Sequence, residues 1–282
     1  MAERPEASEE VRRAFINALN RHGYGFQEAV AERVTQFGRI GRTTWRVEAT
    51  EFPVAVQDAT TSIDLVLRAG PTDAYLVGEC KRVDPALGRW CFARTPVRGS
   101  ESRLNRVILE QLACSTEGGN LRSKPLVKPW LPEPFTIGFE IRTSAKGDGV
   151  GGSKDAIQQS LGQVLRGASG LANHYYSRDR PNLGPRSFQF VPAVFTTADL
   201  WVTDVGLTTT ELASGKIPKE HFHIAPSGWL WFNYNLSPNL RHSIPGDTPK
   251  GLAEVLVAES TRSVAIVNPR GLAEFLEVEF GD

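Results

Sequence analysis

Two apolar stretches near residue 70 carry charged side chains of the kind that can do chemistry. The stretches Ser62–Ala69 (SIDLVLRA) and Ala74–Val83 (AYLVGECKRV) are typical of β-strands, and the four residues between them have the composition of a turn. A four-residue loop pairs the last residue of the first stretch with the first residue of the second. This register places Asp64 directly opposite Glu79, and Lys81 shares a face with Glu79 because side chains two apart point the same way.

Two carboxylates that face each other on a sheet need a compensating interaction. Cross-strand neighbours have Cβ atoms about 4.5–5.5 Å apart, and like charges at that separation are destabilising. A shifted pKa is one solution; a divalent cation is another, because hard cations such as Mg²⁺ take carboxylate oxygens. An amine such as Lys81 can hold or activate a water beside that ion. The alternatives are structural: Asp64 is an edge-strand charge that opposes aggregation, and Glu79 with Lys81 is a surface ion pair.

The flanking sequence predicts a mixed α/β domain built around one sheet. Apolar residues four apart (Val11, Phe15 and Leu19) indicate a helix over residues 9–21. Helices come first, then a meander of strands, then α/β alternation. The other predicted helices cover residues 26–37, 104–112, 155–173 and 252–259, with a last one after Pro269; the other strands cover 45–56, 135–142, 187–202 (interrupted by Pro192), 229–234 and 264–267.

The motif Ile63-Asp64, a short hairpin and then Glu79-Cys80-Lys81 resembles the PD-(D/E)XK nuclease superfamily, with Ile63 in place of the proline of the nominal motif. The resemblance covers roughly residues 9–205. It implies a restriction-endonuclease-like αβββαβ core, that is, a mixed β-sheet flanked by helices. The chain then divides into a nuclease core over residues 1–206 and a C-terminal extension over 207–282 that packs on the core.

The resemblance also implies a metal centre. By similarity, Asp64 and Glu79 bind Mg²⁺, for which Mn²⁺ is an alternative, and Lys81 assists the attacking water. The main-chain carbonyl of Cys80 is a further candidate ligand.

Members of the superfamily often add an acid from the first core helix and a glutamine from the helix after the catalytic strands. Glu28 is the candidate acid, although at 100° per residue it lies off the apolar stripe of its helix, where a solvated side chain is the alternative. Gln158 is the candidate glutamine because it lies at the margin of an apolar stripe, whereas Gln159 and Gln163 point further away. A plain polar helix flank is the alternative for Gln158.

The charge distribution singles out the middle of the chain. The sequence has 32 basic and 32 acidic residues, yet residues 81–186 carry a net charge of +8, between segments of −3 and −5. A basic segment can present a positive face to a polyanion, and a solvated surface is the alternative. Arg82, Arg89, Arg94 and Lys154 are the candidate phosphate contacts, because cations supply the salt-dependent part of nucleic-acid binding.

These observations predict a Mg²⁺-dependent endonuclease that hydrolyses phosphodiester bonds. The resemblance favours DNA over RNA and a prokaryotic restriction or antiviral defence role, with a defence-system protein as a further candidate partner. Cutting of both strands favours a homodimer. The alternative is a catalytically silent module of the same fold that binds nucleic acid, or a regulatory subunit in which residues 207–282 dock a partner.

Composition bears on the compartment. No apolar run approaches the ~18 residues that a membrane span needs, and the acidic N-terminus is unlike a secretory signal. The 3 cysteines have no CxxC spacing and form no disulfide framework. We therefore expect a reduced, cytoplasmic protein without a membrane partner.

Overall fold

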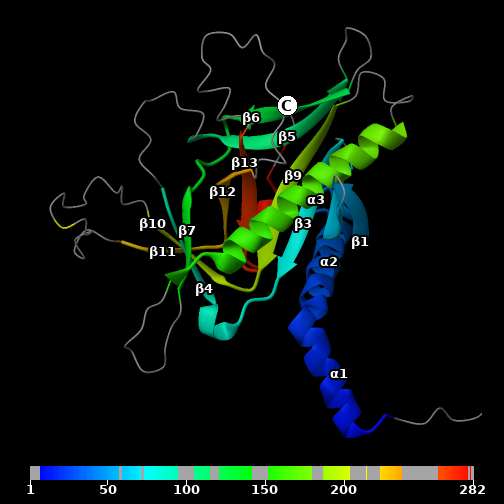
Figure 1. The fold of residues 1–282 in the computed structure, drawn as a ribbon, viewed down its shortest axis with the longest axis vertical. Coiled ribbons are helices and arrows are strands. Elements are labelled where there is room, and N and C mark those ends of the chain that lie inside the picture. Colours follow the sequence, from blue (N-terminus) through cyan, green and yellow to red (C-terminus); the bar gives the residue numbers. More distant parts are fainter. Residues whose placement is uncertain are drawn as a thin grey trace, which may run out of the picture.

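Two β-sheets and four α-helices make up the part of the chain that the computed structural model describes (Figure 1). The described residues are 7–56, 59–70, 73–94, 105–114, 121–141, 152–179, 187–203, 214, 223–236, 260–278 and 280.

The larger sheet has eight strands, six of them in the order β1-β2-β3-β9-β13-β12. Strands β1, β2 and β3 form an antiparallel meander, whereas β3, β9 and β13 run parallel to one another. Strand β5 pairs with β9 and β6 with β5. The bounds are β1 (Trp45–Val56), β2 (Ala59–Ala69), β3 (Ala74–Lys81), β5 (Val107–Cys114), β6 (Leu121–Lys128), β9 (Ser187–Thr196), β12 (Trp229–Asn235) and β13 (Thr261–Val267).

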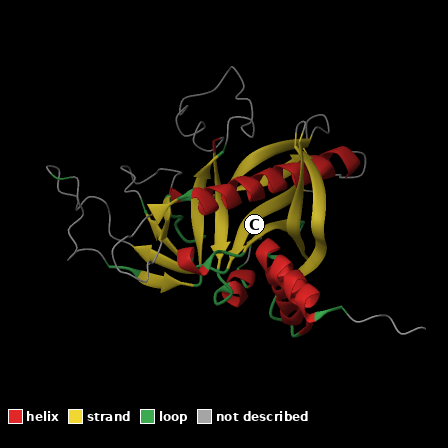
Figure 2. Cartoon of the chain, turned by 60° about the horizontal axis from the view of Figure 1, so that its bottom comes forward, coloured by secondary structure: helices red, strands yellow, loops and turns green. Residues whose placement is uncertain are grey.

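Helices cover both faces of this sheet (Figure 2). Helix α3 (Asp155–Asp179) crosses one face, while α2 (Tyr24–Arg39) and α5 (Leu272–Leu276) pack on the other. Helix α1 (Glu9–His22) projects from the body at the beginning of α2 (Figure 1). The structure is therefore mixed α/β with a mixed sheet flanked by helices, as the sequence predicts.

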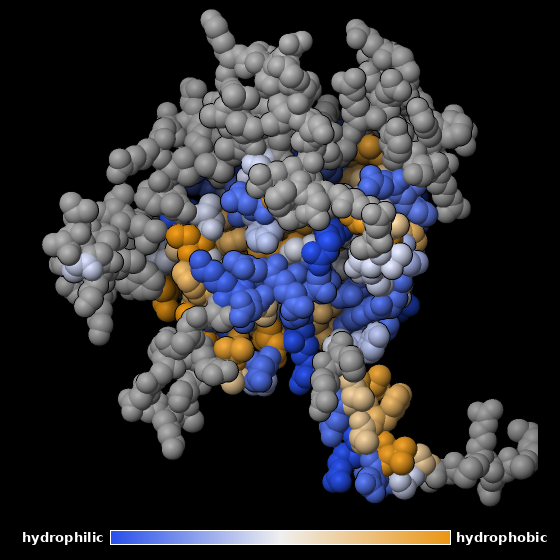
Figure 3. Space-filling view, viewed as in Figure 1, coloured by the Kyte–Doolittle hydropathy of each residue, from blue (hydrophilic) through white to orange (hydrophobic). Residues whose placement is uncertain are grey.

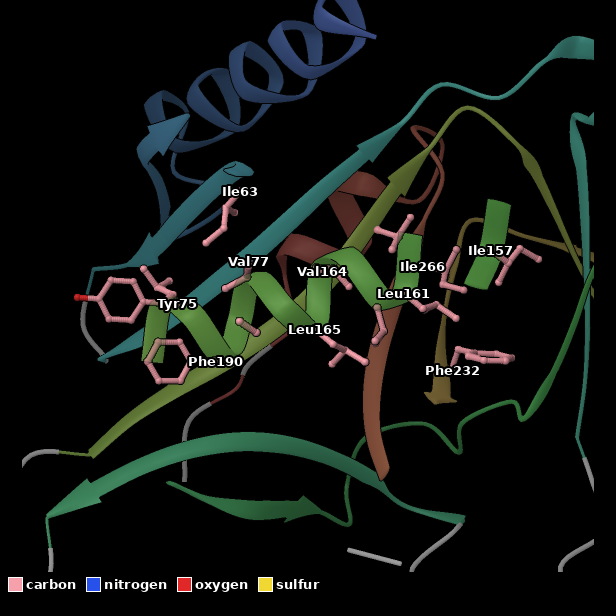
Figure 4. Packing of buried hydrophobic residues seen from close by; sticks show 14 of the residues in the cluster. Ile63, Tyr75, Val77, Ile157, Leu161, Val164, Leu165, Phe190, Phe232 and Ile266 are labelled. Atoms are coloured by element: carbon pink, nitrogen blue, oxygen red, sulfur yellow. The ribbon is translucent and has the colours of Figure 1, made fainter. Parts of the chain in front are cut away.

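The apolar stripe predicted for residues 155–173 forms the core beneath α3 (Figure 4). Its residues are all buried: Ile157, Leu161, Val164, Leu165, Ala168 and Leu171. They pack on side chains from one face of the sheet, among them Ile63, Val77 and Ile266. At Gly167 an added Cβ would lie only 3.0 Å from Ile63, so the helix approaches the sheet closely.

The opposite face carries a second core. Val30 and Val34 of α2 are buried there, and Leu65 and Leu67 of β2 point toward them. Val66, which lies between these two leucines, belongs to the α3 core instead, because side chains alternate across a strand. A sheet buried on both faces leaves few positions for charged groups, so charged residues within its strands are candidates for a functional site.

The smaller sheet, ordered β11-β10-β4-β7-β8, packs beside the α3 core through the buried rings of Trp90 and Phe92. It also supports α3 directly. The buried carboxylate of Glu140 accepts the backbone N–H groups of Ala156 and Ile157 at 2.6 and 3.2 Å, and so caps the first turn of the helix. The bounds are β4 (Arg89–Ala93), β7 (Ile137–Ile141), β8 (Gly152–Ser153), β10 (Asp199–Thr203) and β11 (Ala225–Ser227).

Three sequence predictions were wrong. The first is the single sheet, because the described residues form two sheets. Residues 107–114 form strand β5 rather than part of a helix, because their apolar run is buried between β6 and β9. Pro192 does not interrupt β9: residues 187–190 pair with β5 and residues 193–195 with β13 on the same edge. The proline, which has no N–H to donate, lies where the strand changes partners.

Most of the other predicted elements are confirmed with shifted ends. The helix predicted over 252–259 lies outside the described residues. Among the described residues, no helix is long and apolar enough to cross a membrane.

The approach of β2 to β3 depends on Gly78, which precedes Glu79. An added Cβ at Gly78 would meet the Phe195 ring at 2.8 Å and Leu65 at 3.3 Å. We expect Gly78→Ala to lower the free energy of unfolding by about 1–3 kcal/mol, measured by urea denaturation, because the packed core must shift. Gly25→Ala is the matched control: nothing lies within 4 Å, and alanine favours a helix, so no loss is expected. A loss at Gly25 equal to that at Gly78 would contradict this account.

Candidate active site

The β2–β3 hairpin has the register that the sequence predicts. Its ladder runs from Arg68 opposite Tyr75 to Leu65 opposite Gly78. One further step along the same register would pair Asp64 with Glu79, and the charge of Asp64 acts on Glu79. The ladder stops before that step, so the two acids lie where β2 and β3 begin to separate.

Asp64 is held by backbone contacts on both sides. Its carboxylate accepts the N–H of Cys80 at 2.7 Å, and its main-chain carbonyl accepts the Nε2–H of Gln27 at 2.9 Å. Burial raises the pKa of the Asp64 carboxyl above its usual value, while the hydrogen bond from Cys80 opposes that rise. The side chain is thus oriented toward β3 without a full countercharge.

Glu79 is the more strongly perturbed acid. Burial, and then the neighbouring charge of Asp64, raise the pKa of Glu79 to about 8, against the smaller opposing effects of Lys81 and Arg166. Desolvation and a like charge both disfavour the ionised form, so Glu79 holds a proton at neutral pH unless a cation replaces it. Paired acids of this kind are typical of functional sites.

Lys81 and helix α3 meet at the edge of these acids. The Lys81 Nζ donates to Gln159 Oε1 at 3.4 Å. The glutamine that reaches the site is therefore Gln159, not the expected Gln158. Gln158 is exposed, and both glutamines line a pocket of about 230 Å³ with Tyr234 and Leu236. The apolar stripe of α3 is buried as predicted, so the stripe alone does not indicate which of the two adjacent glutamines Lys81 reaches.

Glu51 of β1 is a third acid near this point, and the sequence analysis missed it. It has a φ of 49°, and of the described non-glycine residues it alone has a positive φ. Its neighbours pair with the residues on either side of Asp64, and its carboxylate accepts the Ser62 hydroxyl at 3.2 Å. The charge of Glu51 contributes to the raised pKa values of both Asp64 and Glu79. Nothing in the sequence signals a left-handed residue inside a strand.

The acid expected from the first core helix does not join the cluster. Glu28 is exposed on α2, and it is not among the charges that act on Asp64 or Glu79. The residue of α2 that touches the site strand is its neighbour, the buried Gln27. Because α2 packs by its apolar stripe, position 27 faces β2 and position 28 faces solvent.

Two of the candidate phosphate contacts have structural partners. Arg82 donates to the carbonyl of Asn20 at the end of α1, at 2.8 Å. Arg94 stacks 4.4 Å from the centre of the Phe135 ring and also donates to a backbone carbonyl. Both cations are engaged in holding elements together.

The other two basic candidates lie on the smaller sheet and at the start of α3. Arg89 is exposed at the first position of β4. Lys154, also exposed, has its Nζ 4.6 Å from the centre of the Phe139 ring. An exposed cation that rests on an aromatic ring remains accessible to an anion.

The donor set at the hairpin fits a hard cation. Among the described residues, no group of three or more His, Cys, Asp or Glu side chains is arranged to hold a metal ion. Mg²⁺ needs fewer, because it keeps several waters and is usually held by one or two carboxylates. Asp64 and Glu79 supply two carboxylates whose charge is undercompensated, and Cys80 adds a main-chain carbonyl between Glu79 and Lys81.

Comparison of the chain with protein-family models, with curated proteins and with solved structures found no match.

The raised pKa of Glu79 predicts a pH-dependent stability of the metal-free protein. Between about pH 4.5 and pH 8 the folded state keeps a proton on Glu79 that the unfolded state has lost, so the free energy of unfolding falls as the pH rises through that window. In EDTA, we expect Glu79→Gln to remove a slope of up to about 1.4 kcal/mol per pH unit, measured by urea denaturation at several pH values. The exposed Glu274→Gln is the control and keeps the wild-type slope. Parallel curves for wild type and Glu79→Gln would refute the assignment.

The left-handed backbone at Glu51 predicts that glycine at this position is more stabilising than alanine, the reverse of the usual order in a strand. We expect Glu51→Gly to unfold with a free energy about 1 kcal/mol higher than that of Glu51→Ala, because only glycine adopts a positive φ without a steric cost. At the neighbouring exposed Thr50, glycine should instead be less stable than alanine. The two pairs are compared by urea denaturation, and the same sign at both positions would show that φ at Glu51 carries no strain.

Proposed function

We propose that this chain is a metal-dependent endonuclease of the PD-(D/E)XK type that hydrolyses DNA phosphodiester bonds. The observation that carries the proposal is the convergence of Asp64 and Glu79, from adjacent strands, with the Lys81 amine on the same strand as Glu79. Both acids feel the charge of Lys81, as their pKa values record.

The topology around the hairpin supports the same proposal. When strands β4 to β8, which lie between β3 and α3, are treated as an insertion, the elements α2, β1, β2, β3, α3 and β9 have the αβββαβ order that the sequence resemblance implies. Strand β9 returns parallel to β3 after α3 has crossed the sheet. Charged groups at the end of β3 therefore lie at an edge flanked by helices, with α3 contributing Gln159 and Arg166.

Each residue of the site has a distinct part in the proposed reaction. A divalent cation held by Asp64, Glu79 and the Cys80 carbonyl would neutralise charge that builds on the scissile phosphate. The hydrogen bond from the Cys80 N–H keeps the Asp64 carboxylate turned toward β3. The Lys81 ammonium, positioned by Gln159, orients the attacking water and stabilises the developing negative charge.

Restriction or defence is the biological setting that we propose, and DNA is the substrate we favour over RNA. Exposed cations such as Arg89 and Lys154 would add salt-dependent affinity for the phosphate backbone.

The test is cleavage of a supercoiled plasmid in Mg²⁺. Wild type should nick or linearise it, whereas Asp64→Asn, Glu79→Gln and Lys81→Ala should each lose at least about 10²-fold in rate, because each removes a group that acts on the reacting phosphate or water. The control Glu274→Gln removes an exposed carboxylate of α5 and should cleave as wild type does.

A thermal-shift arm reports metal binding without catalysis. Added Mg²⁺ should raise the melting temperature of wild type and of Glu274→Gln, but not that of Asp64→Asn. Equal cleavage by all the variants would identify a contaminating nuclease. A gel shift with DNA and no cleavage with Mg²⁺ or Mn²⁺ would favour a silent binding module of the same fold.

A further inference from the structure

A pocket of about 230 Å³ lies between helix α3 and the end of strand β12. Its lining on the helix runs from Gln158 to Arg166, and its lining on the sheet side is Tyr234 of β12 and Leu236 just after that strand. Figure 3 shows hydrophilic side chains gathered over α3, in the middle of this face of the molecule. The pocket therefore opens beside a polar helix surface rather than within an apolar patch.

The lining combines apolar walls with amide groups. Leu165 and Leu236 are both buried, and the half-buried ring of Tyr234 adds a third apolar surface. The exposed side chains of Gln158 and Gln159 supply amide donors and acceptors. A nucleobase has apolar faces and polar edges, and proteins bind an unstacked base between aromatic or apolar side chains while hydrogen-bonding its edge. The chemistry of this lining therefore suits a nucleobase.

Gly162 keeps the pocket open. Helix α3 contains three glycines, Gly162, Gly167 and Gly170, although glycine disfavours a helix. Packing accounts for two of them, because an added Cβ at Gly167 or Gly170 would lie 3.0 or 2.7 Å from a side chain of the sheet. At Gly162 the nearest atom is Nη1 of Arg166, at an ordinary contact distance of 3.5 Å. Close packing does not require this glycine, and its missing side chain leaves room in the pocket that it lines.

The pocket shares two residues with the candidate active site. Gln159 lines the pocket and also accepts a hydrogen bond from the Lys81 Nζ at 3.4 Å. Arg166 lines the pocket, and its charge acts on Glu79. Because the same side chains border both places, a DNA strand bound at the acids can place a nearby nucleotide at the pocket.

We propose that this pocket binds one unpaired base of the DNA strand that the active site cleaves. The inference rests on the proposed nuclease function and adds a substrate preference to it. Pockets for drug-sized molecules usually hold about 300–1,000 Å³, so the smaller volume here suits a single ring system. A base inside a duplex is stacked and paired and cannot enter, so the preferred DNA has an unpaired or extruded nucleotide near the cut.

The charges at the pocket favour a base that belongs to a strand. A base in the pocket leaves its sugar and phosphates outside, where the exposed guanidinium of Arg166 and the ammonium of Lys81 can bind them. Adenine matches the lining best, because a glutamine amide can pair with two atoms of its edge. A free nucleotide carries the same base, so the experiment must distinguish the two sources.

Fluorescence anisotropy in EDTA measures binding without cleavage. It compares a duplex that carries one bulged adenine with the fully paired duplex of the same sequence. Wild type should bind the bulged duplex at least about 10-fold more tightly, because stacking of one base on a side-chain ring strengthens binding by roughly that factor. Gln158→Ala, which removes an exposed amide, should reduce this preference.

The decisive variant is Gly162→Leu, whose side chain fills the pocket without touching the acids. Leucine is a good helix former, so the variant should keep the wild-type circular dichroism spectrum while it loses the preference for the bulged duplex. Gln36→Leu is the matched control, because it adds the same side chain to an exposed position of α2 that does not line the pocket, and it should keep the preference.

A photochemical cross-link locates the bound base. With 5-iodouracil in the bulge, irradiation of the wild-type complex should link the base to Tyr234, identified by mass spectrometry of the digested protein. Gly162→Leu should lose this link, and Gln36→Leu should retain it. A cross-link formed only with residues outside the pocket would place the base elsewhere and overturn the proposal.

Three other outcomes would also overturn it. These are equal affinity of wild type for the two duplexes, a preference that survives in Gly162→Leu, and displacement of the bulged duplex by adenosine monophosphate at a concentration close to that of the duplex, which would identify a free nucleotide as the ligand.

Failure of this inference can be told apart from failure of the proposed function. Plasmid cleavage in Mg²⁺ that depends on Asp64, by a protein without preference for the bulged duplex, would reject the base pocket and leave the nuclease intact. A preference that Gly162→Leu abolishes, in a protein that cleaves no DNA, would do the reverse.

Discussion

The hydrogen bond from the Cys80 N–H to the Asp64 carboxylate is the interaction on which the site depends. It lies one step past the last residue pair of the β2–β3 ladder, so a side-chain oxygen binds a strand N–H at the point where the two strands part. The bond turns Asp64 toward β3 and brings its charge to Glu79. This arrangement leaves two carboxyl groups without a full countercharge in a largely buried sheet, which lowers the stability of the fold. That cost favours a functional role for the two acids.

The surrounding elements hold the end of the β2–β3 hairpin, where this hydrogen bond lies, in place. Gly78 lets β2, β3 and Phe195 approach closely, and the parallel pairing of β3 with β9 extends through Lys81. Helix α3, capped by Glu140 of the smaller sheet, crosses the same face and presents Gln159 to the lysine. The two cores on either side of the sheet exclude water from the strands, and that exclusion is what shifts the pKa of Glu79.

Local patterns predicted well wherever one interaction dominates. The hairpin register follows from the loop length and the alternation of apolar residues, and the buried face of α3 follows from helical periodicity. Prediction failed where several partners compete: the run that forms β5 was predicted as part of a helix, and Pro192 was expected to interrupt a strand whose partner changes there. The helical phase of α2 and α3 was predicted correctly, but the polar residue that reaches the site, Gln27 or Gln159, was not, because the apolar stripe does not show which polar neighbour meets a partner on the sheet.

The sequence by itself determined the mixed α/β class and the register of the β2–β3 hairpin, since short-range alternation and one turn suffice for both. The tertiary structure decided which other polar residues lie around Asp64, Glu79 and Lys81. Gln27, Glu51 and Gln159 come from three other elements, and their placement depends on how β1 twists and how two helices seat on the sheet. It also decided that the apolar stripe of α1 faces solvent, because a stripe in the sequence predicts an amphipathic helix but cannot say what lies against it.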